Sequence, residues 1–98
     1  MKPTTPEFKE KLLELSSLSE KINDGDRKKI LQLMKEHSEE IEELYEENNE
    51  HWKIETADLI ILCYQLLILE NKDIKKVFEE CFPRYDKKLR NLLKEKKV

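Results

Sequence analysis

Two pairs of acidic side chains, each with a spacing of three residues, are the groups in this sequence best suited to chemistry. Glu36 and Glu39 form the first pair, and Glu55 and Asp58 form the second. Residues three apart are neighbours on a helix surface, so each pair can direct two carboxylates at one point. Carboxylate oxygens bind hard divalent cations, which keep some water and leave room for a substrate phosphate. The spacing therefore predicts a divalent-metal site built by two helices, with Mg²⁺, or alternatively Mn²⁺, as the ion.

The second acid pair opens the most apolar segment of the chain, residues 59–69. A helix that is apolar nearly all round is expected to be interior. Carboxylates at the edge of a core stay ionised only when a cation or hydrogen bonds compensate them. Two like charges about 4 Å apart repel by about 4 kcal/mol at an effective dielectric constant near 20, so four clustered carboxylates need a bound cation or partial protonation. Spacing makes such a cluster feasible, and folding decides whether the two pairs face each other.

Apolar residues at steps of three and four predict an all-α fold, a helical bundle of four to five helices in a single domain over residues 1–98. Charged residues make up 42% of the chain, a composition typical of helices rather than sheets. Helices are expected over residues 6–23, 27–47 and 52–70, followed by a short helix from 74 to 81 and a last segment from 85. A break or kink is expected at Phe82-Pro83, because proline lacks the N–H that a helix interior uses.

Cap and turn residues delimit the first two helices. Thr5 or Thr4 is expected to cap the first helix, with Pro6 at its first position. Gly25 suits a left-handed position after that helix, and Asp26 is expected to cap the second. These residues place the first acid pair in the middle of the second helix.

The acids of the second helix form a ridge beside its apolar face. At about 100° per residue, Glu36 and Glu40 border that face, and Glu39 and Glu43 lie next to them. His37 lies on the apolar face itself, and we assign it to the core rather than to a metal. A solvated ridge is the alternative to a metal site, because runs of charge are usually solvated.

Composition limits the partners and the compartment. The formal net charge is −3, which offers no electrostatic case for binding nucleic acid. We find no signal-peptide pattern, and the apolar run at 59–69 is shorter than the ~20 residues that span a bilayer, so we expect a cytoplasmic protein without membrane contact. Cys63 and Cys81 are expected to be free thiols. A core this small makes association with a second copy a reasonable expectation.

The two acidic stretches resemble the signature of the all-α nucleoside triphosphate pyrophosphatases, the superfamily of MazG, the dimeric dUTPases and phosphoribosyl-ATP pyrophosphohydrolase. That signature is E-E-x-x-E on one helix and E-x-x-D at the start of the next. Residues 55–59 match the second half, and residues 35–39 match the first half with Lys35 in place of the leading Glu. A second register over residues 39–43 makes Glu40 and Glu43 the first-helix ligands. The resemblance covers residues 30–77, about half the chain.

The resemblance implies Mg²⁺-dependent hydrolysis of a (deoxy)nucleoside triphosphate between its α and β phosphates, which yields the monophosphate and pyrophosphate. Metal binding and catalysis would then fall to Glu36, Glu39, Glu55 and Asp58. Candidate substrate contacts are Lys53, Lys72 and Arg84 for the phosphates and Trp52 for the base. The resemblance also implies a homodimer or homotetramer.

A different class of protein fits the same acids. A non-catalytic acidic helical-bundle interaction module would carry a solvated ridge or bind a basic partner with it. The two classes differ in their response to divalent metal, because only the enzyme is expected to gain thermal stability from it.

Overall fold

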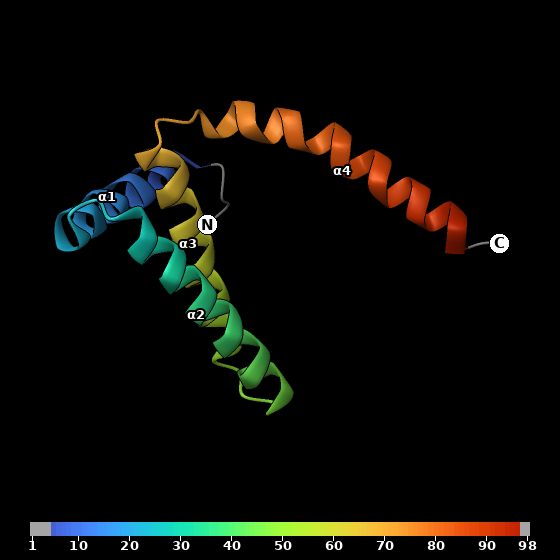
Figure 1. Ribbon diagram of the computed structural model, residues 1–98, viewed down its shortest axis with the longest axis horizontal. Coiled ribbons are helices and arrows are strands. Elements are labelled where there is room, and N and C mark those ends of the chain that lie inside the picture. The colour runs from blue at the N-terminus through green and yellow to red at the C-terminus, as the bar shows by residue number, and fades with distance from the viewer. Residues whose placement is uncertain (1–4, 97–98) are drawn as a thin grey trace.

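The computed structural model describes residues 5–96, which form four helices. These are α1 (Pro6–Asn23), α2 (Arg27–Glu46), α3 (Trp52–Leu69) and α4 (Ile74–Lys96). Within the described range there is no strand, so the all-α prediction is confirmed. Helices α2 and α3 form a long antiparallel hairpin, and α1 packs against α3 near the end of the hairpin where α2 begins (Figure 1). Helix α3 is central, because it contacts each of the other three.

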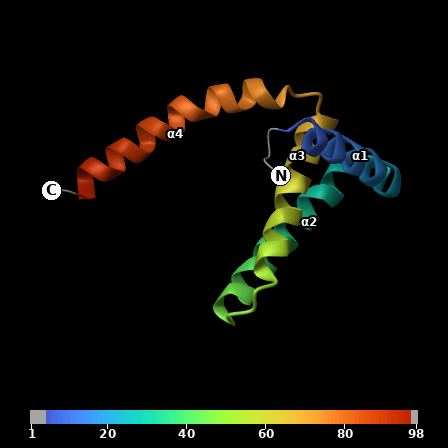
Figure 2. The ribbon, with the colours of Figure 1, turned by 180° about the vertical axis from the view of Figure 1, so that it is seen from behind.

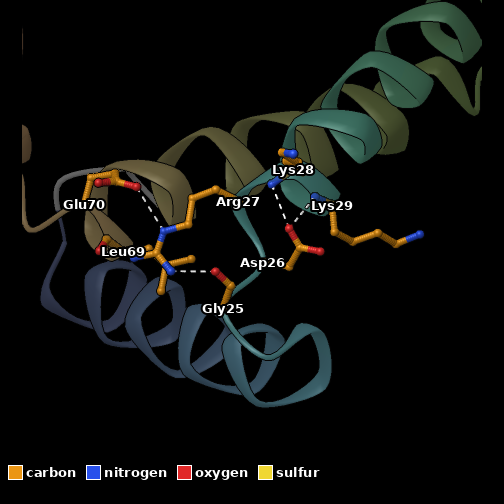
Figure 3. A network of polar contacts seen from close by, with 7 residues as sticks. All are labelled: Gly25, Asp26, Arg27, Lys28, Lys29, Leu69 and Glu70. Carbon is orange, nitrogen blue, oxygen red and sulfur yellow. Dashed lines mark hydrogen bonds and ion pairs between the residues drawn. The ribbon is translucent and has the colours of Figure 1, made fainter.

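Local capping explains where the first two helices begin. The Thr5 side chain accepts a hydrogen bond from the backbone N–H of Phe8, at 3.3 Å, and Pro6 occupies the first turn. Asp26 accepts from the N–H groups of Lys28 and Lys29, at 3.0 and 3.3 Å (Figure 3). Both caps were predicted and are confirmed, whereas the alternative cap Thr4 lies outside the described residues.

The turn between α1 and α2 uses two left-handed residues in succession. Asp24 has φ 52° and Gly25 has φ 65°. The predicted left-handed Gly25 is confirmed, and Asp24 precedes it as the residue that ends α1. A side chain at Gly25 would be strained by the positive φ alone, so this turn requires the glycine.

Arg27 ties this turn to the far end of α3. Its guanidinium donates to the carbonyl oxygens of Gly25, at 2.6 Å, and Leu69, at 2.7 Å, and its Nε lies 2.9 Å from a carboxylate oxygen of Glu70 (Figure 3). Leu69 is the last residue of α3, where carbonyl groups have no partner within the helix. One side chain thus fixes the α1–α2 turn to the C-terminal end of α3.

The core is small and partly polar. Ile30, Leu62 and Leu69 are the buried apolar residues among those described, and partly buried Leu33, Met34 and Leu66 pack against them. Gln65 is 1% exposed, and its amide donates to the Ser19 hydroxyl at 2.7 Å, which links α3 to α1. Little apolar surface is therefore removed from water inside a single chain.

Helix α4 differs from the prediction. The expected break at Pro83 does not occur, because α4 runs as one helix of 23 residues through that proline, in place of the expected short helix at 74–81 and separate segment from 85. A proline in a helix leaves the carbonyl four residues earlier without its donor, here that of Glu79. Glu79 is exposed, so water can hydrate that carbonyl and the helix continues.

Beyond its first turns, α4 extends away from the rest of the chain, as both views of the ribbon show (Figures 1 and 2). Tyr64 of α3 meets Phe78 at a ring-centroid distance of 6.4 Å, and from Phe82 to Lys96 every residue is exposed. The radius of gyration is 16.2 Å, against about 13 Å for a compact domain of this length. The chain on its own is elongated. None of the helices in residues 5–96 is long and apolar enough to cross a membrane.

Candidate metal centre

The antiparallel hairpin brings one residue of α2 against the predicted acid pair of α3. His37, Glu55 and Asp58 each offer a metal-ligand atom, and these three atoms lie within 4.8 Å of one another. The Nδ1 atom of His37 is hydrogen-bonded to a carboxylate oxygen of Glu55. The side chains of His37 and Glu55 are 23% and 13% exposed, so the cluster is accessible from solvent at one side.

Glu55 is held in its ionised form by its neighbours. The hydrogen bond from His37 lowers the pKa of the Glu55 carboxyl below its ordinary value, and partial burial opposes this effect. The charge of His37, a hydrogen bond to Glu40 and the charge of His51 lower the pKa further. The Nε2 atom of His51 lies 3.5 Å from Glu55, one helical turn before it. An ionised carboxylate at this position is the form that binds a cation.

The first predicted acid pair lies elsewhere on α2. Glu36 and Glu39 are exposed, and Glu36 accepts a hydrogen bond from Gln32 at 3.1 Å on the outer surface. At about 100° per residue, Glu36 is turned about 100° and Glu39 about 160° from His37, which faces α3. The structure therefore brings Glu55 and Asp58 together with His37, and it leaves Glu36 and Glu39 outside this cluster.

The face that α2 turns toward Glu55 carries His37 and Glu40. Residues 36–40 read E-H-x-x-E, which fits the spacing E-E-x-x-E with histidine at its second position. This register is neither of the two weighed from the sequence, and Glu43 lies one turn further along α2. His37 could have been identified from the sequence as a member of this cluster, because it lies on the apolar face of the helix, three residues before Glu40.

The predicted substrate contacts are scattered. Trp52 packs edge-on against Tyr45, with ring centroids 5.5 Å apart, at the tip of the hairpin. Lys53 pairs with Glu50 in the same turn. Lys72 lies beyond the opposite end of α3, which is about 16 Å past Asp58 at 1.5 Å per residue. Arg84 belongs to the exposed part of α4.

A small hollow lies beside the cluster. It has a volume of about 210 Å³ and is lined by residues of all three packed helices, namely Leu15, Ser19, Leu33, His37, Asp58, Ile61, Leu62 and Gln65. Cavities that enclose drug-sized ligands measure about 300–1,000 Å³. The hollow can hold an ion with water or a phosphate group, and it is too small to enclose a whole nucleotide.

The donor set fits a divalent ion. One imidazole nitrogen and two carboxylates, with Glu40 close by, are ligands that Mg²⁺, Mn²⁺ and later first-row metals accept. The acids alone would suit Mg²⁺, whereas the imidazole favours a transition metal.

Comparisons with models of protein families, with curated proteins and with solved structures found no match.

Proposed function

We propose that this protein is a divalent-metal-dependent nucleoside triphosphate pyrophosphohydrolase that cleaves its substrate between the α and β phosphates. The observation that carries the proposal is the convergence of His37, Glu55 and Asp58 from two antiparallel helices, with ligand atoms within 4.8 Å. Glu55 and Asp58 are the E-x-x-D pair whose resemblance to the pyrophosphatase signature is described above. The substrate class implies that the protein works in the cytoplasm, where nucleoside triphosphates are present.

Each residue of the cluster has a distinct role in this proposal. Glu55, Asp58 and a ring nitrogen of His37 hold the ion, and the hydrogen bond between His37 and Glu55 keeps that carboxylate ionised and oriented. When bound, the ion lowers the pKa of a coordinated water and neutralises phosphate oxygens. Glu40 lies near Glu55 on the facing helix, where its hydrogen bond with Glu55 helps to orient that carboxylate.

The imidazole bears on the choice of metal. Divalent first-row metals bind nitrogen ligands more strongly than Mg²⁺ does, and Mn²⁺ also accepts carboxylates readily. We therefore propose that Mg²⁺ supports the reaction and that Mn²⁺ binds more tightly. His37→Gln removes the ring nitrogens and should reduce the preference for Mn²⁺.

The deciding experiment is a panel of ribonucleoside and deoxyribonucleoside triphosphates, incubated with Mg²⁺ or Mn²⁺. Pyrophosphate and orthophosphate are measured separately, because only cleavage between the α and β phosphates releases pyrophosphate. Glu55→Gln and Asp58→Asn should each lower the rate at least 100-fold, since each removes a charged ligand. Glu42→Gln is the matched control, because Glu42 is an exposed residue of α2 outside the cluster.

The alternative class gives the opposite result. An acidic interaction module would release neither product from any nucleotide and would show no metal-dependent rise in melting temperature. Release of orthophosphate alone would instead indicate cleavage at the γ phosphate and contradict the proposed reaction.

A further inference from the structure

Helix α4 carries an apolar stripe that its own chain leaves uncovered. We call residues 82–96 the arm, and every one of them is exposed. The stripe recurs at steps of three and four and consists of Phe82, Tyr85, Leu89, Leu92 and Leu93. An isolated helix of about 15 residues is marginal in water, and an amphipathic helix gains most of its stability by packing its apolar face. A second surface is therefore needed to cover the arm.

A matching apolar surface lies between α1 and α3. A groove of about 420 Å³ there is lined by Phe8, Lys11, Leu12, Leu15, Ala57, Ile60 and Ile61. Ile60 is 48% exposed although it lies in the most apolar helix. The groove shares Leu15 and Ile61 with the hollow beside the metal cluster, so the two surfaces are continuous.

The charges of the two surfaces are complementary. The arm contains six Lys or Arg and two Asp or Glu, whereas residues 36–50 contain eight acids and no Lys or Arg. Glu40, Glu43 and Glu47 follow His37 at steps of three and four, and His37 lines the hollow together with residues of α1. At about 100° per residue, these acids are turned about 60–120° from His37, to the same side as Glu36, so they form an exposed acidic edge of α2 beside the face that packs on α3. Arg84 and Lys88 form one edge of the arm, beside the stripe.

The lengths of the two surfaces agree. At 1.5 Å per residue, the tip of the hairpin lies about 15 Å from Ile60, and Lys88 to Lys94 lie about 9–18 Å beyond Phe82. With Phe82 in the groove and the arm running toward the tip of the hairpin, the basic part of the arm lies level with the acidic part of α2. The exposed area of the stripe with Phe78 is about 600 Å², near the ~800 Å² per partner of a stable interface.

We propose that the arm of each chain docks on a second copy of this protein, with its stripe in the α1–α3 groove and its basic edge along Glu40, Glu43 and Glu47. Mutual exchange of the two arms gives a two-fold symmetric dimer in which both stripes are covered. This proposal does not rest on the proposed function. It also gives the small hollow a further wall, which a single chain lacks.

The apolar part of the interface is tested by sedimentation velocity on the full chain at micromolar concentration. The wild-type protein should sediment as a dimer, and Leu89→Asp with Leu92→Asp should sediment as a monomer. Asn91→Asp adds a charge on the opposite side of the same helix and should remain dimeric. A monomeric wild type, or a doubly substituted variant that stays dimeric, would overturn the proposal.

The polar part is tested by charge exchange between two variants. One carries Arg84→Glu and Lys88→Glu, and the other carries Glu43→Lys and Glu47→Lys. Each variant alone should dissociate at least tenfold more readily than wild type, because like charges then face each other. A mixture of the two should form a heterodimer, in which both arm contacts again join opposite charges. Failure of the mixture to associate more tightly than either variant alone would refute the placement of the arm.

Discussion

Replacing Arg27 by alanine should destabilise the fold by an amount that its contacts allow one to estimate. The side chain donates to two backbone carbonyls, those of Gly25 and Leu69, and pairs with Glu70. Each backbone hydrogen bond is worth about 1 kcal/mol net. The ion pair is worth about 0.5 kcal/mol, because Arg27 and Glu70 are 41% and 51% exposed and solvent screens them. The expected loss is about 2.5 kcal/mol.

Thermal unfolding followed by circular dichroism measures this loss. For a domain of this size, about 1 kcal/mol shifts the melting temperature by 4–8 °C, so Arg27→Ala should melt about 10–20 °C lower. All samples need the same protein concentration, because the proposed association would also stabilise the folded chain. Arg90→Ala is the matched control, since Arg90 pairs with Asp86 at 3.0 Å within one exposed helix and should cost less than about 0.5 kcal/mol. Equal melting temperatures for the two variants would refute the assignment of Arg27 as the tie between turn and helix.

Three further outcomes are expected. At ten times its dissociation constant, Mn²⁺ should stabilise the protein by about 1.4 kcal/mol in thermal melts, and Asp58→Asn should abolish the gain; an unchanged gain would place the ion elsewhere. Burial raises the pKa of the Cys63 thiol, so iodoacetamide should label Cys63 more slowly than Cys81 at pH 8, and equal rates by peptide mapping would contradict this. The folded-state pKa of Glu55 is lowered from 4.5, so its contribution to stability is present above that pH and is lost as the pH falls below it. The difference in denaturation midpoint between wild type and Glu55→Gln should therefore shrink in acid, and a constant difference from pH 6 to pH 3 would contradict this.

The first three helices could be predicted closely because their signals are local. Thr5 and Asp26 cap helices through hydrogen bonds within three residues, and Gly25 marks a left-handed turn that few other residues tolerate. These features do not depend on the remainder of the fold.

The rotation of α2 about its own axis, which decides the residues that face α3, could not be predicted in the same way. A step of one residue turns a helix by about 100°, so the choice between Glu36 and His37 as the residue facing α3 depends on packing. Ile30, fully buried between the helices, fixes that rotation, and seven residues later His37 lies on the same face. The E-x-x-D spacing of Glu55 and Asp58 is local, and the structure keeps both carboxylates in one cluster.

The course of α4 also depends on more than local pattern. Pro83 is a helix breaker by propensity, but it lies in the exposed part of α4, where water can hydrate the carbonyl that loses its donor. No periodicity indicates whether a stripe such as Tyr85 and Leu89 packs on its own chain or on another, because the pattern is the same in both cases.

In the proposed dimer, the exposed second half of α4 links the secondary structure of the protein to its concentration. Dilution would separate the copies by mass action, and a lone arm beyond Phe82 would have few contacts to stabilise its helix. Helix content at 222 nm should therefore fall as the solution is diluted, well before the α2–α3 hairpin unfolds. Trypsin should cut first at the lysines of the released arm. The arm would then link the concentration of the protein to its proteolysis and to its assembly.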